Sequence, residues 1–179
     1  MVGPRHRHTG VALVMLALAT GLACHDAPTS PTPGRTTAAA SVSSDGPKLL
    51  KCSPHSAQSA SATVGVAGGE VALGANRLVV PGGALSGATV LEVAVPGSSR
   101  VQLDLSANGQ DHFTFAAPVA ITIDLGRCAS TDLDGGSLSV WYIDAATGQL
   151  LEQMGGSFDA VAKTMTFTTD HFSSYAVAH

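Results

Sequence analysis

The chain has 179 residues, and 12% of them are charged, against about 25% in typical soluble domains. Glycine and proline together number 29, which argues against coiled coils and charged disordered tails. Without the signal peptide argued for below, seven Lys and Arg stand against thirteen Asp and Glu. No basic patch is available to bind phosphates, so we expect no nucleic-acid partner.

Residues 1–23 resemble a secretory signal. Arg5 and Arg7 form a positive start, and an uncharged apolar run of thirteen residues, 11–23, ends at Cys24. This run is shorter than the ~20 residues that span a bilayer, so it indicates a signal peptide rather than an anchor helix.

The residues Gly-Leu-Ala before Cys24 resemble the bacterial lipoprotein signal, in which the cysteine becomes the first mature residue and carries the lipid. The alternative is ordinary cleavage after Ala23, which leaves a free thiol. An exposed lone thiol is a liability in an oxidising space, which favours lipidation. We therefore expect an extracytoplasmic protein held on a membrane through Cys24, in the periplasm, on the outer membrane or on the cell surface.

Residues 24–47 are rich in Pro, Ser, Thr and Ala, and they contain no aromatic residue and one large aliphatic, Val42. Such a segment cannot bury enough apolar surface to offset the entropy lost on ordering. It is predicted to be a disordered linker between the membrane and a domain over 48–179.

The two remaining cysteines, Cys52 and Cys128, most simply pair with each other in a secreted domain. On the chain-entropy model this disulfide would add roughly 4–5 kcal/mol to the free energy of unfolding. No Cys-x-x-Cys pair or zinc spacing is present, so a redox or metal role is not expected.

From residue 48 to 156 no stretch between consecutive Gly or Pro residues exceeds eleven residues, which favours short strands. Apolar and polar residues alternate clearly over 91–95, 101–105 and 119–125. Further strands are expected over 62–66, 69–73, 76–80, 112–115, 138–143, 149–153, 158–162, 164–168 and 172–178. The prediction is an all-β fold, an antiparallel two-sheet β-sandwich.

All eight aromatic residues fall in this domain, where strand positions make core packing the first expectation. Trp141 and Tyr142 are adjacent and therefore point to opposite faces of a strand. Trp141 is the candidate for an exposed contact. An exposed aromatic beside Asp or Asn would favour a carbohydrate-binding module.

Four local patterns occur in an order that resembles the ZU-five domain, the module named for zonula occludens proteins and uncoordinated-five netrin receptors. They are Gly-Gly-Glu-Val-Ala-Leu at 68–73, Leu-Val-Val-Pro-Gly-Gly-Ala-Leu at 78–85, Phe-Ala-Ala-Pro-Val at 115–119, and His-Phe-Ser at 171–173 with Tyr175. The resemblance covers about 65–179 and is closest to bacterial secreted versions. It implies a β-sandwich interaction module that generally has no activity on external substrates.

Some relatives in that family cleave themselves at His-Phe-Ser. Carried over, Ser173 would attack the carbonyl carbon of Phe172 with His171 as base. In a regular strand the Cα atoms of His171 and Ser173 would be ~6.6 Å apart, so this chemistry needs a kink, for which a turn at Thr169-Asp170 is predicted. In the alternative, His171 opens the last strand and bonds to backbone, and Phe172 packs in the core.

Other catalytic patterns are missing, including Gly-x-Gly loops, the P-loop and Gly-x-Ser-x-Gly, so no cofactor or metal is expected. The leading hypothesis is a non-catalytic, lipid-anchored β-sandwich that binds a protein or polysaccharide at the cell envelope. Self-cleavage between Phe172 and Ser173 is the alternative.

Overall fold

A computed structural model describes residues 46–133 and 137–179. The predicted signal peptide, Cys24 and the linker up to residue 45 lie outside the described residues. The described elements are β1 (Gln58–Val64), β2 (Gly69–Leu73), β3 (Asn76–Val80), β4 (Thr89–Val95), β5 (Gln102–Ala107), β6 (Phe113–Asp124), α1 (Ser130–Leu133), β7 (Ser139–Ile143), β8 (Leu150–Gly155), β9 (Ser157–Asp159), β10 (Thr164–Phe172) and β11 (Ser174–Ala178). In this part of the chain, no helix has the length and apolarity to cross a membrane.

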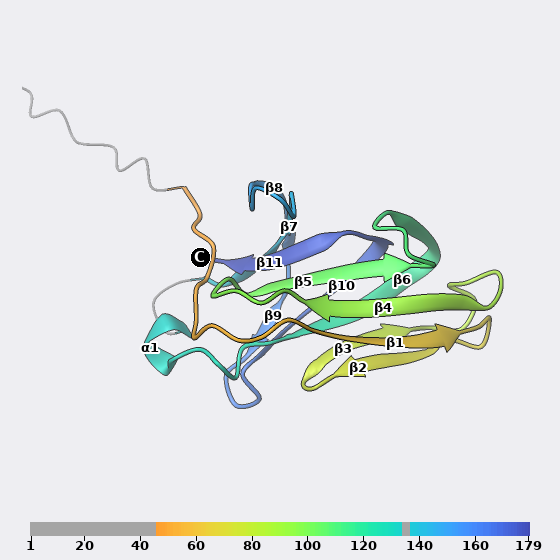
Figure 1. The fold of residues 1–179 in the computed structure, drawn as a ribbon, viewed down its shortest axis with the longest axis horizontal. Helices are drawn as coiled ribbons and strands as arrows, with labels where there is room; N and C mark the ends of the chain where they lie inside the picture. Colours follow the sequence, from red (N-terminus) through yellow and green to blue (C-terminus); the bar gives the residue numbers. More distant parts are fainter. Residues whose placement is uncertain (1–45, 134–136) are drawn as a thin grey trace, which may run out of the picture. The chain divides into compact units, whose positions relative to one another are not determined.

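The strands form two antiparallel sheets, which confirms the predicted all-β two-sheet sandwich (Figure 1). One sheet has the order β1-β4-β5-β11-β7-β8 and the other the order β2-β3-β6-β10-β9. The chain changes sheet repeatedly, so strands far apart in sequence become neighbours: β11 pairs with both β5 and β7.

The core lies between the sheets and is built from alternate strand positions. Leu91 and Val93 of β4 and Ile121 and Ile123 of β6 are fully buried, as the alternation predicts. Fully burying one such side chain contributes about 1.5–3 kcal/mol. The central strands therefore supply most of the apolar surface that holds the sheets together.

Two predicted strands join and one is shorter than predicted. The ranges 112–115 and 119–125 form the single strand β6, whose pairing with β10 shifts around Pro118, a residue that has no N–H to donate. The range 158–162 is wrong beyond Asp159. The Oδ1 atom of Asp159 accepts from the N–H groups of Val161 and Ala162, and this bonding closes a turn instead.

The predicted turn at Thr169-Asp170 is wrong, because both residues lie inside β10, where the register shifts between Thr169 and His171. His171 also does not open the last strand; it sits near the end of β10. The chain passes from one sheet to the other at Ser173, the residue between β10 and β11.

A hydrogen bond closes this crossing. The Tyr175 hydroxyl donates to the backbone oxygen of His171 at 2.7 Å, the arrangement known as a tyrosine corner in β-sandwiches. The Tyr175 ring itself is fully buried and packs against Phe167. The corner therefore fixes the path of the chain between the two sheets.

The segment that enters the domain is tied into the first sheet. The N–H of Leu50 donates to the oxygen of Val177 at 2.8 Å, and the N–H of Val101 donates to the oxygen of Leu50 at 3.1 Å. Leu50 is also part of the buried core. Residues 48–50 are therefore an ordered part of the domain.

Candidate binding site

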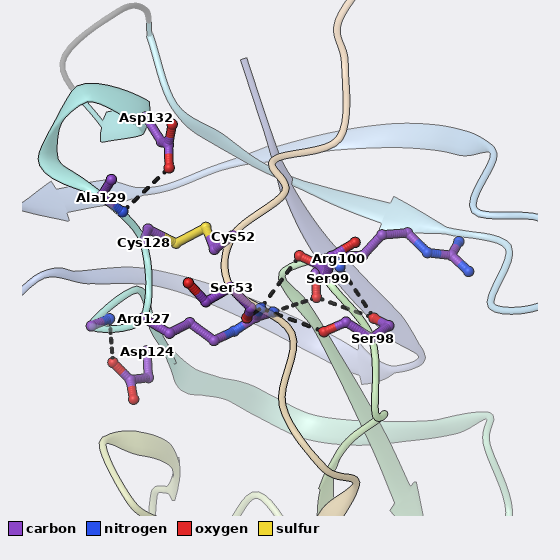
Figure 2. Close-up of a disulfide and its surroundings, with 11 residues drawn as sticks. Cys52, Ser53, Ser98, Ser99, Arg100, Asp124, Arg127, Cys128, Ala129 and Asp132 are labelled. Carbon is purple, nitrogen blue, oxygen red and sulfur yellow. Dashed lines mark hydrogen bonds between the residues drawn. A yellow bond between two sulfur atoms is a disulfide. The ribbon is translucent and has the colours of Figure 1, made fainter.

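The disulfide is the first feature of the candidate site. Cys52 and Cys128 are bonded, with their Cα atoms 4.7 Å apart, which confirms the predicted pairing and lies within the usual range for disulfides. The bond joins the entering segment to the loop after β6 (Figure 2). Residues close to each cysteine are thereby held together, among them His55 and Arg127.

Arg127, on the loop after β6, binds the entering segment and the 98–100 loop through its guanidinium group. One terminal nitrogen, Nη1, donates to the oxygens of Ser53, Ser98 and Ser99, and the other, Nη2, donates to the oxygen of Arg100. Figure 2 shows the side chain reaching from the loop after β6 to the 98–100 loop. Only a planar group with several donors can serve carbonyls that face it from several directions.

Partial burial lowers the pKa of Arg127, and the nearby Asp124 carboxylate opposes this shift by favouring the charged form. A guanidinium remains charged at any physiological pH. Both terminal nitrogens donate to backbone oxygens, so the guanidinium group holds the two loops together.

Beside this clamp lies a cavity of about 200 Å³ at one end of the sandwich; we call it the end cavity. Its polar lining residues are His55, Gln58, Asn76, Gln102, Asp124 and Arg127. Its aliphatic lining residues are Leu73, Val95, Val101 and Ile123. Gln58 and Gly74, which also lines it, are exposed, so the end cavity is open to solvent.

Several polar groups of the end cavity are already hydrogen-bonded. The Oδ1 atom of Asn76 accepts from the N–H of Asp124, and its Nδ2 donates to the oxygen of Leu73. The Oδ1 atom of Asp124 accepts from the N–H of Gly126, and Nε2 of Gln102 donates to Asp104. These bonds fix the walls of the end cavity.

His55 differs from these neighbours. Its Nδ1 lies 2.7 Å from the backbone oxygen of Ser56, and because a carbonyl only accepts, Nδ1 carries the hydrogen. In the neutral ring Nε2 is then an acceptor. Nε2 is buried and has no partner among the described residues, a situation that costs about 1–3 kcal/mol.

His171, Phe172 and Ser173 lie where the chain passes from β10 to β11. The His171 ring makes its contacts with Asp170 and Thr169 instead of Ser173. Its Nδ1 lies 3.1 Å from Oδ1 of Asp170 and 3.3 Å from Oγ1 of Thr169. Within residues 46–133 and 137–179 no hydrogen bond joins His171 to Ser173. Phe172 is fully buried and packs edge-on against Phe115.

Trp141 lies on β7, where its register partners are Ala176 of β11 and Gln153 of β8. It is half-buried, and none of the eight aromatic side chains is exposed. Tyr142 packs against the core and lies near the His171 and Tyr175 rings. Trp141 is thus partly accessible, and its exposure is lower than that of an open surface residue.

Sequence reasoning missed the end cavity. His55 reads as an isolated histidine, and nothing in the local pattern marks Arg127 as a clamp. One signal was available: both residues lie within three positions of a cysteine predicted to form a disulfide. A bonded pair brings its sequence neighbours together.

No protein-family model matches the chain. The chain is similar to an amylopullulanase of Thermoanaerobacterium thermosulfurigenes, with 33% identity over 75 residues. The matched region is 41% of this chain and 4% of the amylopullulanase. The similarity concerns a small part of a large protein and does not define a family.

Proposed function

We propose that this chain is a lipid-anchored, non-catalytic module that binds a polysaccharide at the cell envelope. The observation that carries the proposal is the end cavity, in which fixed polar groups stand beside aliphatic walls. Sugars present hydroxyl groups at their edges and C–H groups on their faces, so they match a lining of this kind.

The partial similarity to an amylopullulanase supports the polysaccharide rather than a protein as ligand. A matched segment amounting to 4% of that protein fits an accessory region better than a complete enzyme. The resemblance of the sequence patterns to the ZU-five domain also favours an interaction module. On this reading the chain holds a glucan and does not cut it.

Attachment to the envelope is proposed from the signal-like residues 1–23 and from Cys24. The disulfide supports an oxidising compartment, because such bonds persist outside the cytoplasm. We expect Cys24→Ser to move the protein from the membrane fraction to the soluble fraction, with Ser41→Ala in the linker as the control that stays on the membrane. Equal partitioning of the two variants would contradict lipid anchoring.

Ligand binding is tested by electrophoresis of the native chain through gels that contain pullulan, amylose or peptidoglycan. The proposal predicts slower migration in at least one polysaccharide gel, by comparison with a reference protein that binds none of them. Unchanged migration in all three gels, together with crosslinking to an envelope protein, would replace the polysaccharide by a protein partner.

A further inference from the structure

We propose that two copies of this chain associate through β1, which pairs antiparallel with β1 of the second copy across a two-fold axis at Ser61. This inference goes beyond the function proposed above and does not depend on it, because it rests on the backbone of a strand at the edge of the first sheet.

Among the described strands, four lie at sheet edges, and β1 is the least protected of them. Proteins guard exposed edges with charges, prolines, bulges or very short strands. β8 carries Glu152 and has an irregular register, β2 carries Glu70, and β9 has three residues. β1 has seven residues, none of them charged or proline, and its register with the neighbouring β4 is unbroken (Figure 1). An edge of this kind can pair with another strand.

The backbone of β1 presents hydrogen-bonding groups at this edge. The N–H of Asn108 donates to the oxygen of Val90 at 2.7 Å, and the N–H of Val90 donates to Oδ1 of Asn108 at 3.0 Å. The backbone groups of Val90 therefore point away from β1. Thr63, the register partner of Val90, directs its own N–H and C=O away from β4, to the open edge. By alternation along the strand, the same holds for Ser61 and Ser59.

These edge groups are self-complementary. Two β1 strands that run antiparallel about Ser61 place Ser59 opposite Thr63 of the second copy, and Ser61 opposite the same residue of that copy. Each of the three opposed pairs then exchanges two hydrogen bonds. Such a contact uses the same surface on both copies, as a closed two-fold dimer requires. It would join the first sheets of the two copies into one continuous sheet.

The side chains of β1 allow this approach. Residues 59–63 are Ser, Ala, Ser, Ala and Thr, all of them small. Glu92 on β4 is the register partner of Ser61 and carries a carboxylate. In the dimer the two Glu92 residues would be three strand spacings apart, about 14 Å, which exceeds the ~8 Å screening length at physiological ionic strength. Repulsion between like charges therefore does not prevent the pairing.

The contact would also bring an exposed apolar side chain against the second copy. Val90 is 48% exposed and stands opposite Thr63. Because Thr63 would lie opposite Ser59 of the second copy, Val90 would lie in the same cross-strand row as Ser59 and Ala94 of that copy. Those two residues line a cavity of about 370 Å³ on the face of the first sheet that is turned away from the core. Val90 would border this cavity in the dimer.

Sedimentation velocity of the full chain tests the dimer, with Cys24→Ser to remove the proposed lipid site. We expect a monomer–dimer equilibrium that depends on concentration, since one strand pair buries less than a standard interface. Ser61→Pro removes the N–H at the two-fold axis, which β4 does not use, and should raise the dissociation constant at least about tenfold. Ser61→Ala keeps that N–H and should dimerise like the unaltered strand. Urea unfolding checks that each variant is folded.

Cysteine crosslinking tests the register without a proline. In the Cys24→Ser chain, Ser61→Cys should form a disulfide between copies, because opposed residues of a hydrogen-bonded pair have Cα atoms about 5.5 Å apart. Ser59→Cys is the matched control. Its two cysteines would be offset by four positions, ~13 Å along the strand, and should stay reduced.

A monomer at every concentration would overturn the proposal, whether residues 24–45 of the same chain cover the edge or nothing does. Equal dimerisation of Ser61→Pro and Ser61→Ala would overturn pairing through β1. Equal crosslinking of Ser61→Cys and Ser59→Cys, or crosslinking of neither, would overturn the two-fold register.

Discussion

At the scale of single residues, the hydrogen bonds of Arg127 can be tested by a single substitution. Its guanidinium serves four backbone oxygens on two segments. Arg127→Lys leaves a compact cation that cannot reach all of them. Since partly buried carbonyls then lose their donors, we expect the free energy of unfolding to fall by about 1–3 kcal/mol in urea titrations.

Arg77 provides the matched control for this substitution. It pairs with Glu70 on the exposed surface, with a side-chain exposure of 49% for Arg77 and 40% for Glu70. Exposed ion pairs contribute about 0–1 kcal/mol, so Arg77→Lys should leave the unfolding curve nearly unchanged. An equal loss in both variants would mean that the Arg127 bonds have no special role.

Tyr175 makes the stability depend on pH in the alkaline range. Burial raises the pKa of Tyr175 to about 12 from its usual 10.0, although the hydrogen bond with Thr169 opposes the shift. Because the folded pKa is the higher one, the folded state keeps its proton where the unfolded state loses it. This contribution is complete below about pH 10 and is lost as the pH rises towards about 12.

Tyr175→Phe isolates that effect. The variant loses the bond to the His171 oxygen but keeps the Thr169 donor there, so we expect a loss of about 1 kcal/mol at pH 8. Between pH 10 and 12 its stability should fall less steeply than that of the unaltered chain. Parallel curves of unfolding free energy against pH would contradict this explanation.

At the scale of elements, the crossing from β10 to β11 tests the self-cleavage alternative. The strand is interrupted at Ser173, between β10 and β11, where self-cleavage would need a kink in the backbone. The His171 ring, however, faces Asp170 and Thr169. Without a base on its hydroxyl, serine is a weak nucleophile. We expect the denatured, purified protein to give one intact mass, equal to that of Ser173→Ala after correction for the missing oxygen atom. A fragment ending at Phe172 would contradict this.

Element boundaries show where local patterns are sufficient and where they are not. The strand over 76–80 was predictable to the residue, because alternation and flanking turn residues agree there. The strand predicted over 158–162 was too long, because the Asp159 carboxylate accepts from the N–H groups of Val161 and Ala162 and forms a turn. The apolar side chain of Val161 had suggested that the strand continues. The sheet crossing at Ser173 depends on Tyr175 reaching back to His171, a contact that alternation does not encode.

The candidate site was harder to predict than the fold for a geometric reason. The disulfide could be predicted from the number of cysteines and the expectation that the chain is secreted. The end cavity instead combines His55, Asn76, Gln102 and Asp124, which lie far apart along the chain and meet only after both sheets have formed. Side chains with ordinary turn and strand roles thereby come to line one cavity, which no short motif records.

At the scale of the whole molecule, the disulfide links two segments that are 76 residues apart in sequence. Replacing both cysteines by alanine should lower the free energy of unfolding by about 4 kcal/mol, because the unfolded chain regains the entropy of the open loop. Urea titration of the unaltered protein after reduction should give the same curve. A decrease in the free energy of unfolding below about 1 kcal/mol would show that the other contacts of residues 48–52 hold this segment in place without the disulfide.

Removing the disulfide should also weaken ligand binding. His55 and Arg127 stand on opposite sides of the disulfide, on the two segments that it joins. We expect the double alanine variant, under conditions where it is still folded, to bind pullulan more weakly than the disulfide-bonded chain in calorimetric titrations. Equal affinities would place the ligand away from the end cavity.

The measurement that addresses the central claim most directly uses end-labelled pullulan incubated with the purified chain. Retention of the label is scored on a column of immobilised protein, and the length of the eluted glucan is then determined. The account predicts that pullulan is retained and recovered at its original length. Shortened glucan, or passage through the column without retention, would contradict a module that binds polysaccharide without cleaving it.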